Sequence, residues 1–230
     1  MLYFVTGTDT DSGKTLISSA LLHKASGKKC GFKPIASGCD MTEFGLRNTD
    51  AMALISQSNI ELSYQQVNPI AFEPAIAPHI AASNEQVDLS LERVVNLLVE
   101  SANIDADFTL IEGAGGWRLP LGQRHYLSDA IKQLNNQLQN KHDGPKPLGV
   151  VLVVGMKLGC LNHALLTQDA ILNDGLPIVG WVANQVDPQM SEIDANLASL
   201  RQMMSSPFLG YVPYLECPTP EDAAQHLTTL

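Results

Sequence analysis

The chain has 230 residues, of which 45% are hydrophobic and 17% are charged, a composition that excludes a disordered or fibrous protein. Its 14 Lys and Arg residues against 24 Asp and Glu residues give a formal charge of −10, which disfavours nucleic acid and anionic membranes as partners. Length alone allows one α/β domain or two small domains. A phosphate site on such an acidic chain must be built from backbone N–H groups and a few lysines.

The cysteines and the apolar start of the chain favour a cytosolic protein. Cys30, Cys39, Cys160 and Cys217 form no C-x-x-C pair and no metal-like spacing with the six histidines, so we interpret them as reduced thiols. The apolar run at residues 2–5 is too short for a signal peptide or a membrane span. We therefore expect a cytosolic protein without a membrane partner.

Short apolar runs alternate with longer amphipathic segments along the chain. In order, we predict a strand at residues 2–5, a helix at 15–25, a strand at 30–32, helices at 49–57 and 89–102, a strand at 108–111, a helix at 127–139, a strand at 148–154, a helix at 161–173, a strand at 178–183, a helix at 190–203 and a strand at 208–212. Such runs suit strands buried on both faces. The alternation predicts an α/β fold with a mostly parallel central sheet and helices on both faces.

The segment at residues 135–147 turns polar and then rich in proline and glycine. Strong strand signals lie on both sides of it, and no second core begins there. We interpret it as a surface excursion from a single domain that spans residues 1–230.

A phosphate-binding loop follows the first predicted strand. The sequence TGTDTDSGKT at residues 6–15 lies between a strand and an amphipathic helix, the context that a P-loop needs. Its N–H groups would wrap a triphosphate, Lys14 would neutralise phosphate charge, and the Thr15 hydroxyl would bind Mg²⁺. Thr8 replaces the usual first glycine, so an ordinary turn before a capped helix is the alternative. We expect nucleotide binding and a fold of the P-loop NTPase type.

Two carboxylates are candidates for a metal site beside this loop. Glu112 ends a predicted strand before a glycine-rich turn, where open α/β sheets bind ligands. Asp50 lies at the start of a predicted helix. Together with Thr15 they form a set of hard oxygen ligands that suits Mg²⁺. Capping the glycine turn is the alternative for Glu112, and capping the helix is the alternative for Asp50.

A second lysine is expected at the same sheet edge. Lys33 follows a predicted strand and precedes Pro34, which ends the strand. Its ammonium should therefore emerge beside the P-loop, where it needs an anionic partner. Ser37 follows in a loop that can approach a small substrate, although Lys-Pro with small residues is also common in solvated turns.

Nine motifs follow one another along the chain: FVTGTDTDSGKT, GFKPIASG, GLRNTDA, VNPIAF, PHI, LIEGAGGWRLPL, LVVGMKLGCLNHALLT, GWVANQV and LGYVPYL. Together they resemble the dethiobiotin synthetase family over nearly the whole chain, and the K-P-x-A-S-G and VGxKLGCxNHA patterns are far more specific than a P-loop. The resemblance implies an ATP-dependent ligase of biotin synthesis that forms C–N bonds. Its implied reaction converts diaminopelargonic acid, CO2 and MgATP into dethiobiotin, ADP and phosphate.

The resemblance also implies a mechanism and a homodimer. One amine forms a carbamate, ATP phosphorylates the carbamate to a mixed anhydride, and the neighbouring amine closes the ureido ring and expels phosphate. Lys33 and Lys14 would be the catalytic residues, because each step forms or moves negative charge. The loop at residues 157–162 would bind the substrate's carboxylate tail from the opposite subunit.

Further site residues are carried over from the same resemblance. Mg²⁺ would be held by Thr15, Asp50 and Glu112. The substrate would contact Thr10, Lys33, Ser37, Leu158, Gly159, Cys160 and Asn162. ATP would contact Asp11, Ser12, Gly13, Lys14, Thr15, Leu16, Asp50, Glu112, Gly113, Ala114, Gly115, Asn184, Gln185, Pro213, Tyr214 and Leu215, with the Asn184 amide recognising adenine.

Two other functions use a P-loop but fit this chain less well. A P-loop amide-forming synthetase of the cobyrinate type should carry a glutaminase domain, for which 230 residues leave no room. A non-catalytic nucleotide switch of the partition type should carry an extra lysine in the P-loop, at the position that Asp9 occupies. Within the family pattern, Gln185 stands where an acid often follows the asparagine, which bears on how strictly the base is recognised.

Overall fold

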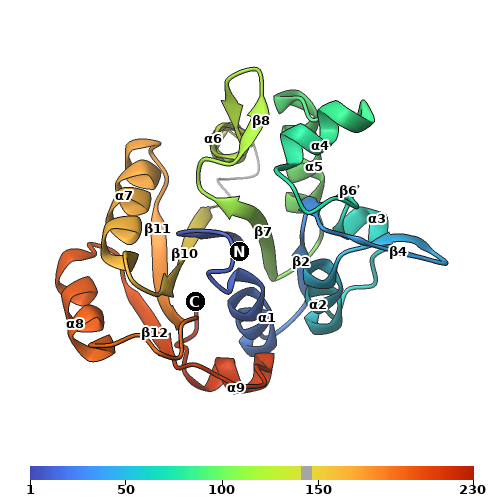
Figure 1. The fold of residues 1–230 in the computed structure, drawn as a ribbon. Helices are drawn as coiled ribbons and strands as arrows, with labels where there is room; N and C mark the ends of the chain where they lie inside the picture. The colour runs from blue at the N-terminus through green and yellow to red at the C-terminus, as the bar shows by residue number, and fades with distance from the viewer. Residues whose placement is uncertain (141–146) are drawn as a thin grey trace.

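The computed structural model describes residues 1–140 and 147–230 of the chain (Figure 1). At the centre of this described part is a parallel six-stranded sheet with the strand order β12-β11-β10-β1-β7-β2. Its strands are β1 (Leu2–Gly7), β2 (Lys29–Phe32), β7 (Phe108–Gly116), β10 (Leu148–Met156), β11 (Ile178–Gln185) and β12 (Phe208–Val212). Each contains one of the predicted strands, so the parallel-sheet prediction is confirmed.

Helices cover both faces of the sheet, as predicted. The six predicted helices form α1 (Lys14–Lys24), α2 (Thr49–Gln57), α5 (Leu91–Ala102), α6 (Leu127–Gln139), α7 (Cys160–Asn173) and α8 (Ile193–Met203). Figure 1 shows α7 and α8 on one side of the sheet and α1 on the other.

The alternation of side chains along the strands builds two cores. Along β1, Phe4 packs in a core with residues of α5, α6, α7 and α8. Its neighbours Tyr3 and Val5 pack in a second core with α1, α2 and the short helix α9 (Pro220–Gln225). Because successive side chains of a strand point to opposite faces, one apolar run serves both cores.

Several short elements are absent from the sequence prediction. They are the helices α3 (Tyr64–Val67), α4 (Pro78–Glu85) and α9, and the strand pairs β3 (Ile35–Ser37) with β6 (Ile70–Phe72), β4 (Asp40–Thr42) with β5 (Gly45–Arg47), and β8 (Pro120–Gly122) with β9 (His125–Tyr126). Strand β7 also differs from the prediction, because it continues to Gly116, which pairs with Gly7, where a turn was expected after Glu112. Ser37 likewise ends a short strand and does not lie in a loop.

The expected surface excursion at residues 135–147 is partly wrong. Residues 135–139 belong to α6, and Asn135 and Leu138 are buried on its inner face. An amphipathic helix packs only one of its faces against the core. A segment of mostly polar residues can therefore be helical and still bury the few residues on its inner face. Residues 141–146 lie outside the described part of the chain.

None of the helices in residues 1–140 and 147–230 combines the length and the apolar character that crossing a membrane requires.

Candidate active site

The carboxyl ends of β1, β2 and β7 meet at one cavity. These strands are neighbours in the sheet, since β7 pairs with β1 on one side and with β2 on the other. The cavity, called here the site cavity, has a volume of about 680 Å³. It is lined by Thr10, Asp11, Gly13, Lys14, Thr15, Lys33, Ala36, Ser37, Asn48, Asp50, Ala75, Ile76, Ala77, Pro78, Ala114, Gly115 and Leu119. Ligands bind at this edge in open parallel sheets, as the sequence predicts.

The P-loop connects β1 to α1 and leaves donors free for an anion. Gly13 has a φ of 84°, in the left-handed region, and a Cβ there would lie 2.0 Å from the Asn184 amide nitrogen. Glycine is therefore required on both grounds. Among the described residues no side chain caps the start of α1, so its first N–H groups remain available for phosphate.

Lys14 lies folded over the P-loop. Its Nζ donates a hydrogen bond to the Asp9 carbonyl at 2.9 Å. Burial and the nearby Lys33 charge lower the pKa of Lys14 to about 8, against the opposing pull of Glu112, Asp50 and Asp11. Near neutral pH the side chain is therefore a cation that a bound phosphate would stabilise further.

Lys33 forms the centre of a buried ion cluster. Its Nζ lies 2.6 Å from Glu112 Oε1 and 3.0 Å from Asp50 Oδ2, and it also donates to the Gly113 carbonyl at 3.2 Å. Lys33 is 4% exposed and Glu112 is 1% exposed. Burial lowers the pKa of Lys33, but the attraction of the two carboxylates outweighs burial and raises it. The anionic partner that the sequence required for this ammonium is therefore present.

Thr15, Asp50 and Glu112 form a donor set that fits Mg²⁺. Thr15 Oγ1 donates to Glu112 Oε1 at 2.9 Å. Glu112 Oε2 is buried and has no hydrogen-bond partner among the described residues. In the described part of the chain no group of three or more His, Cys, Asp and Glu side chains could hold a metal alone. Two carboxylates and a hydroxyl completed by phosphate oxygens are the usual Mg²⁺ environment in nucleotide enzymes.

The two capping alternatives do not describe these carboxylates. Asn48 caps α2, since its Oδ1 accepts from the Ala51 N–H at 3.1 Å, which leaves the Asp50 carboxylate to Lys33. Glu112 is engaged by Thr15 and Lys33 from neighbouring elements. Both carboxylates thus contact Lys33, and Asp50 also lines the site cavity.

Asn184 and Gln185 end β11 on the other side of the P-loop. The buried Asn184 amide donates to the Ser12 carbonyl at 3.0 Å and so supports the loop. Gln185 Oε1 accepts from Tyr211 Oη at 2.6 Å and from the Tyr214 N–H at 3.2 Å. These contacts hold the segment at residues 213–215 beside the end of β11. Recognition of adenine by Asn184 stays a prediction.

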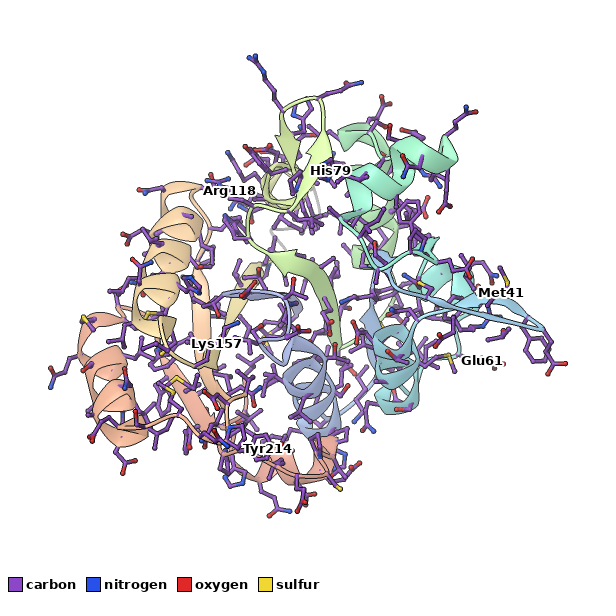
Figure 2. All side chains as sticks on the ribbon, viewed as in Figure 1. Met41, Glu61, His79, Arg118, Lys157 and Tyr214 are labelled. Carbon is purple, nitrogen blue, oxygen red and sulfur yellow. The ribbon has the colours of Figure 1, made fainter. Side chains whose placement is uncertain are left out.

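The loop that connects β10 to α7 lies outside the lining of the site cavity of its own chain. Figure 2 shows Lys157 between α7 and α1, and its Nζ lies 3.0 Å from Asp9 Oδ2 of the P-loop. Leu158 is 96% exposed. Thr10, Lys33 and Ser37, which were predicted to bind the substrate, line the site cavity, whereas four predicted tail-binding residues do not: Leu158, Gly159, Cys160 and Asn162. Their proposed role in a partner's site stays a prediction.

Sequence reasoning missed some residues of the site. Asn48 and the segment at residues 75–78 line the site cavity, although no role was predicted for them. Asn48 and Pro78 belong to the GLRNTDA and PHI motifs, so the motifs themselves were the available signal. The Asp9–Lys157 ion pair could not be predicted from a motif, because the two residues lie 148 positions apart in the sequence.

Known proteins resemble this chain over nearly its full length. A protein-family model described as an AAA domain matches residues 2–222. The ATP-dependent dethiobiotin synthetase BioD of Pseudomonas aeruginosa strain LESB58 is 51% identical over 228 residues, which cover 98% of this chain and 95% of that protein. The protein of the same name from Cellvibrio japonicus is 50% identical, with 98% and 94% covered. The one from Pseudoalteromonas translucida is 44% identical, with 93% and 90% covered.

Solved structures share the fold at low identity. The septum site-determining protein MinD complexed with Mg-ADP from Pyrococcus horikoshii OT3 matches with a TM-score of 0.54 and 17% identity, covering 98% of this chain and 86% of that chain. A ParA family ATPase from Chlorobium tepidum TLS matches with a TM-score of 0.52 and 14% identity, covering 94% and 84%. With the family match, these likenesses confirm the predicted P-loop NTPase fold.

Proposed function

The chain belongs to the ATP-dependent dethiobiotin synthetases, and we propose that its site cavity performs their reaction with the residues described above. It is an ATP-dependent ligase that forms a C–N bond in biotin biosynthesis. The observation that carries the assignment of the site is the convergence of Lys14, Lys33 and Asp50 on one cavity, with the buried Glu112 in contact with Lys33.

The proposed reaction divides the site cavity into a phosphate end and a diamine end. The N–H groups at the start of α1 bind the triphosphate, and Lys14 leaves the Asp9 carbonyl to contact the transferred phosphoryl group. Mg²⁺ held by Thr15, Asp50 and Glu112 would neutralise charge on the same phosphates. The positions of ATP and diamine relative to each other then supply much of the acceleration.

At the diamine end, Lys33, Thr10 and Ser37 hold the carbamate. The Lys33 ammonium balances its negative charge, and the Ser37 hydroxyl, which is buried without a hydrogen-bond partner in the described residues, can donate to it. After phosphorylation, the second amine attacks the carbamate carbon, loses a proton and expels phosphate. No side chain needs to act as a nucleophile.

An assay with diaminopelargonic acid, bicarbonate and MgATP tests this function. Ring closure should release one phosphate for each diamine consumed, and phosphate release should be slow without diamine. Steady ATP hydrolysis that consumes no diamine would instead indicate a nucleotide switch and contradict the proposal.

We also propose that Asn184 selects adenine. Asn184→Asp keeps the size of the side chain but replaces the amide NH₂, which donates to the Ser12 carbonyl in this structure, by a second acceptor oxygen. The carboxylate could no longer both donate to and accept from the edge of adenine. We expect the preference for ATP over GTP, measured as the ratio of the two kcat/KM values, to fall about tenfold, since one unmade hydrogen bond costs about 1–3 kcal/mol. The exposed Asn173 offers a matched control, and Asn173→Asp should leave the ratio unchanged. An unaltered ratio in Asn184→Asp would remove Asn184 from base recognition.

We propose a homodimer in which each loop at residues 157–162 completes the partner's site. Leu158 is exposed, and Leu166 on α7 is 61% exposed. These apolar side chains support a surface that the second subunit of the homodimer would cover. Leu166→Glu should produce monomers in sedimentation velocity and raise the KM for diamine, while the KM for ATP stays unchanged. Met203→Glu, at an exposed position of α8, is the control. A fully active wild-type monomer would contradict the shared site.

We propose further that residues 1–230 act as one domain and that the enzyme works in the cytosol, where ATP is supplied.

A further inference from the structure

Tyr64 and Asn68 connect the two segments that carry Lys33 and Asp50. Tyr64 Oη accepts a hydrogen bond from the Asn48 N–H at 2.7 Å and donates one to Asn68 Oδ1 at 2.8 Å. Asn68 Nδ2 in turn donates to the Lys33 carbonyl. This chain of hydrogen bonds, called here the Tyr64–Asn68 bridge, runs behind the site cavity from the start of α2 to the end of β2.

Each end of the bridge is joined to a charged residue of the site by short backbone connections. At one end, the Lys33 N–H donates to the Val67 carbonyl at 2.9 Å, so both peptide groups of Lys33 are held by residues 67–68. At the other end, Asn48 also caps α2 through Ala51, and Asp50 lies in that first turn. A shift of the bridge would therefore move the Lys33 and Asp50 backbones relative to each other.

The two asparagines of the bridge are buried, Tyr64 is partly buried, and their hydrogen bonds are complementary. Asn48 and Asn68 are 5% and 3% exposed, so water cannot replace a lost partner easily. Asn68 uses its amide oxygen toward Tyr64 and its amide nitrogen toward Lys33, a combination that an aspartate cannot reproduce. The Arg47 guanidinium lies over the Tyr64 ring, 4.2 Å from its centroid, and fixes the ring from the other side.

Two of the three residues of the ion cluster are not held in place by the sheet. Glu112 comes from β7, which pairs with strands on both sides. Lys33 and Asp50 lie beyond the edge strand β2 and at a helix start, outside the sheet ladder. Contacts such as the bridge are therefore needed to hold them 3.0 Å apart.

We propose that Tyr64 and Asn68 are positioning residues for the reaction, because they set the Lys33 ammonium against Asp50 and Glu112 without contacting the substrate. Neither residue lines the site cavity. The proposal rests on the proposed function for its effect on turnover, but its geometric content is independent of it. It assigns a role to the VNPIAF motif, which contains Asn68.

Tyr64→Phe tests the bridge, because it removes one hydroxyl and keeps the ring beneath Arg47. We expect kcat for ring closure to fall about tenfold or more, since small misplacements of reacting groups are costly. The Kd of ATP measured without Mg²⁺ should change less than about twofold, because the bridge does not touch the P-loop. Asn68→Ala should have a similar effect, and the double variant should lose much less than the product of the two single losses.

Tyr3→Phe is the matched control. Tyr3 is a largely buried tyrosine near the amino end of β1, whereas the site cavity lies at the carboxyl ends of the strands. Its hydroxyl donates to Met1 Sδ. The Tyr3→Phe variant should keep the wild-type kcat even if its thermal stability is lower. A wild-type kcat in Tyr64→Phe, or a loss that Tyr3→Phe matches at equal loss of stability, would overturn the proposal.

A readout without turnover separates this inference from the proposed function. The ¹⁵N resonance of the buried Lys33 ammonium reports its contacts, and its hydrogen exchange should speed up about tenfold or more in Tyr64→Phe. An unchanged resonance and exchange rate would refute the bridge even if the wild-type protein closed no ring. An inactive wild type with a changed resonance would refute only the proposed function.

Discussion

Replacing Lys33 by methionine should lower the rate of ring closure at least about a hundredfold, because the carbamate and the departing phosphate lose the cation that faces them. Methionine has a similar length and no charge, so the change isolates the ammonium. ATP should still bind with a Kd within about threefold of wild type, because the P-loop donors remain. The measurement is kcat from coupled phosphate release, together with nucleotide titration of each variant.

The same substitution leaves a buried charge without its partner. Glu112 would keep a carboxylate that is 1% exposed with no cation beside it, and breaking a buried ion pair from one side costs about 3–5 kcal/mol. Thermal unfolding should therefore show a lower Tm. The exposed Lys28, which pairs with Asp105 at the surface, offers the control Lys28→Met, which should keep wild-type rate and Tm. Wild-type turnover in Lys33→Met would contradict the proposed catalytic role.

ATP affinity should fall as the pH rises through about 8, because Lys14 loses its proton there in the free protein. Its pKa is lowered to about 8 chiefly by burial. A bound triphosphate stabilises the ammonium, so the bound form has the higher pKa and the protonated protein binds ATP more tightly. Above the free pKa the affinity should decline by up to about tenfold per pH unit, and binding should take up a proton.

Isothermal titration calorimetry with ATP between pH 7 and 10, in buffers of different ionisation enthalpy, measures both the ATP affinity and the proton uptake. Lys14→Met should bind ATP about tenfold to a hundredfold more weakly at pH 7, the range of one charge-assisted hydrogen bond, and should abolish the proton uptake. Lys24→Met, at the opposite end of the same helix, is the control and should keep the wild-type pH profile. A wild-type affinity that stays constant from pH 7 to 10 would exclude Lys14 from phosphate binding.

The strands of the sheet were predictable because they are buried on both faces. A continuous apolar run such as residues 148–154 is typical of a strand inside a parallel sheet, and all six such runs became strands of one sheet. The short helices α3 and α9 were not predictable in the same way. With four and six residues they are too short for a helical period to stand out, and tertiary contacts stabilise them.

The sequence by itself determined the P-loop, the strand-end lysine and the carboxylates Asp50 and Glu112, because each follows a local pattern of strand, turn or helix start. Only the tertiary structure decided how these residues are joined. It brought Asn184 to the Ser12 carbonyl, Lys157 to Asp9, and Tyr64 and Asn68 to the backbone behind Lys33. Such pairs depend on the order and register of the strands, which no local spacing encodes. Contacts between distant segments can therefore be read only from the folded structure.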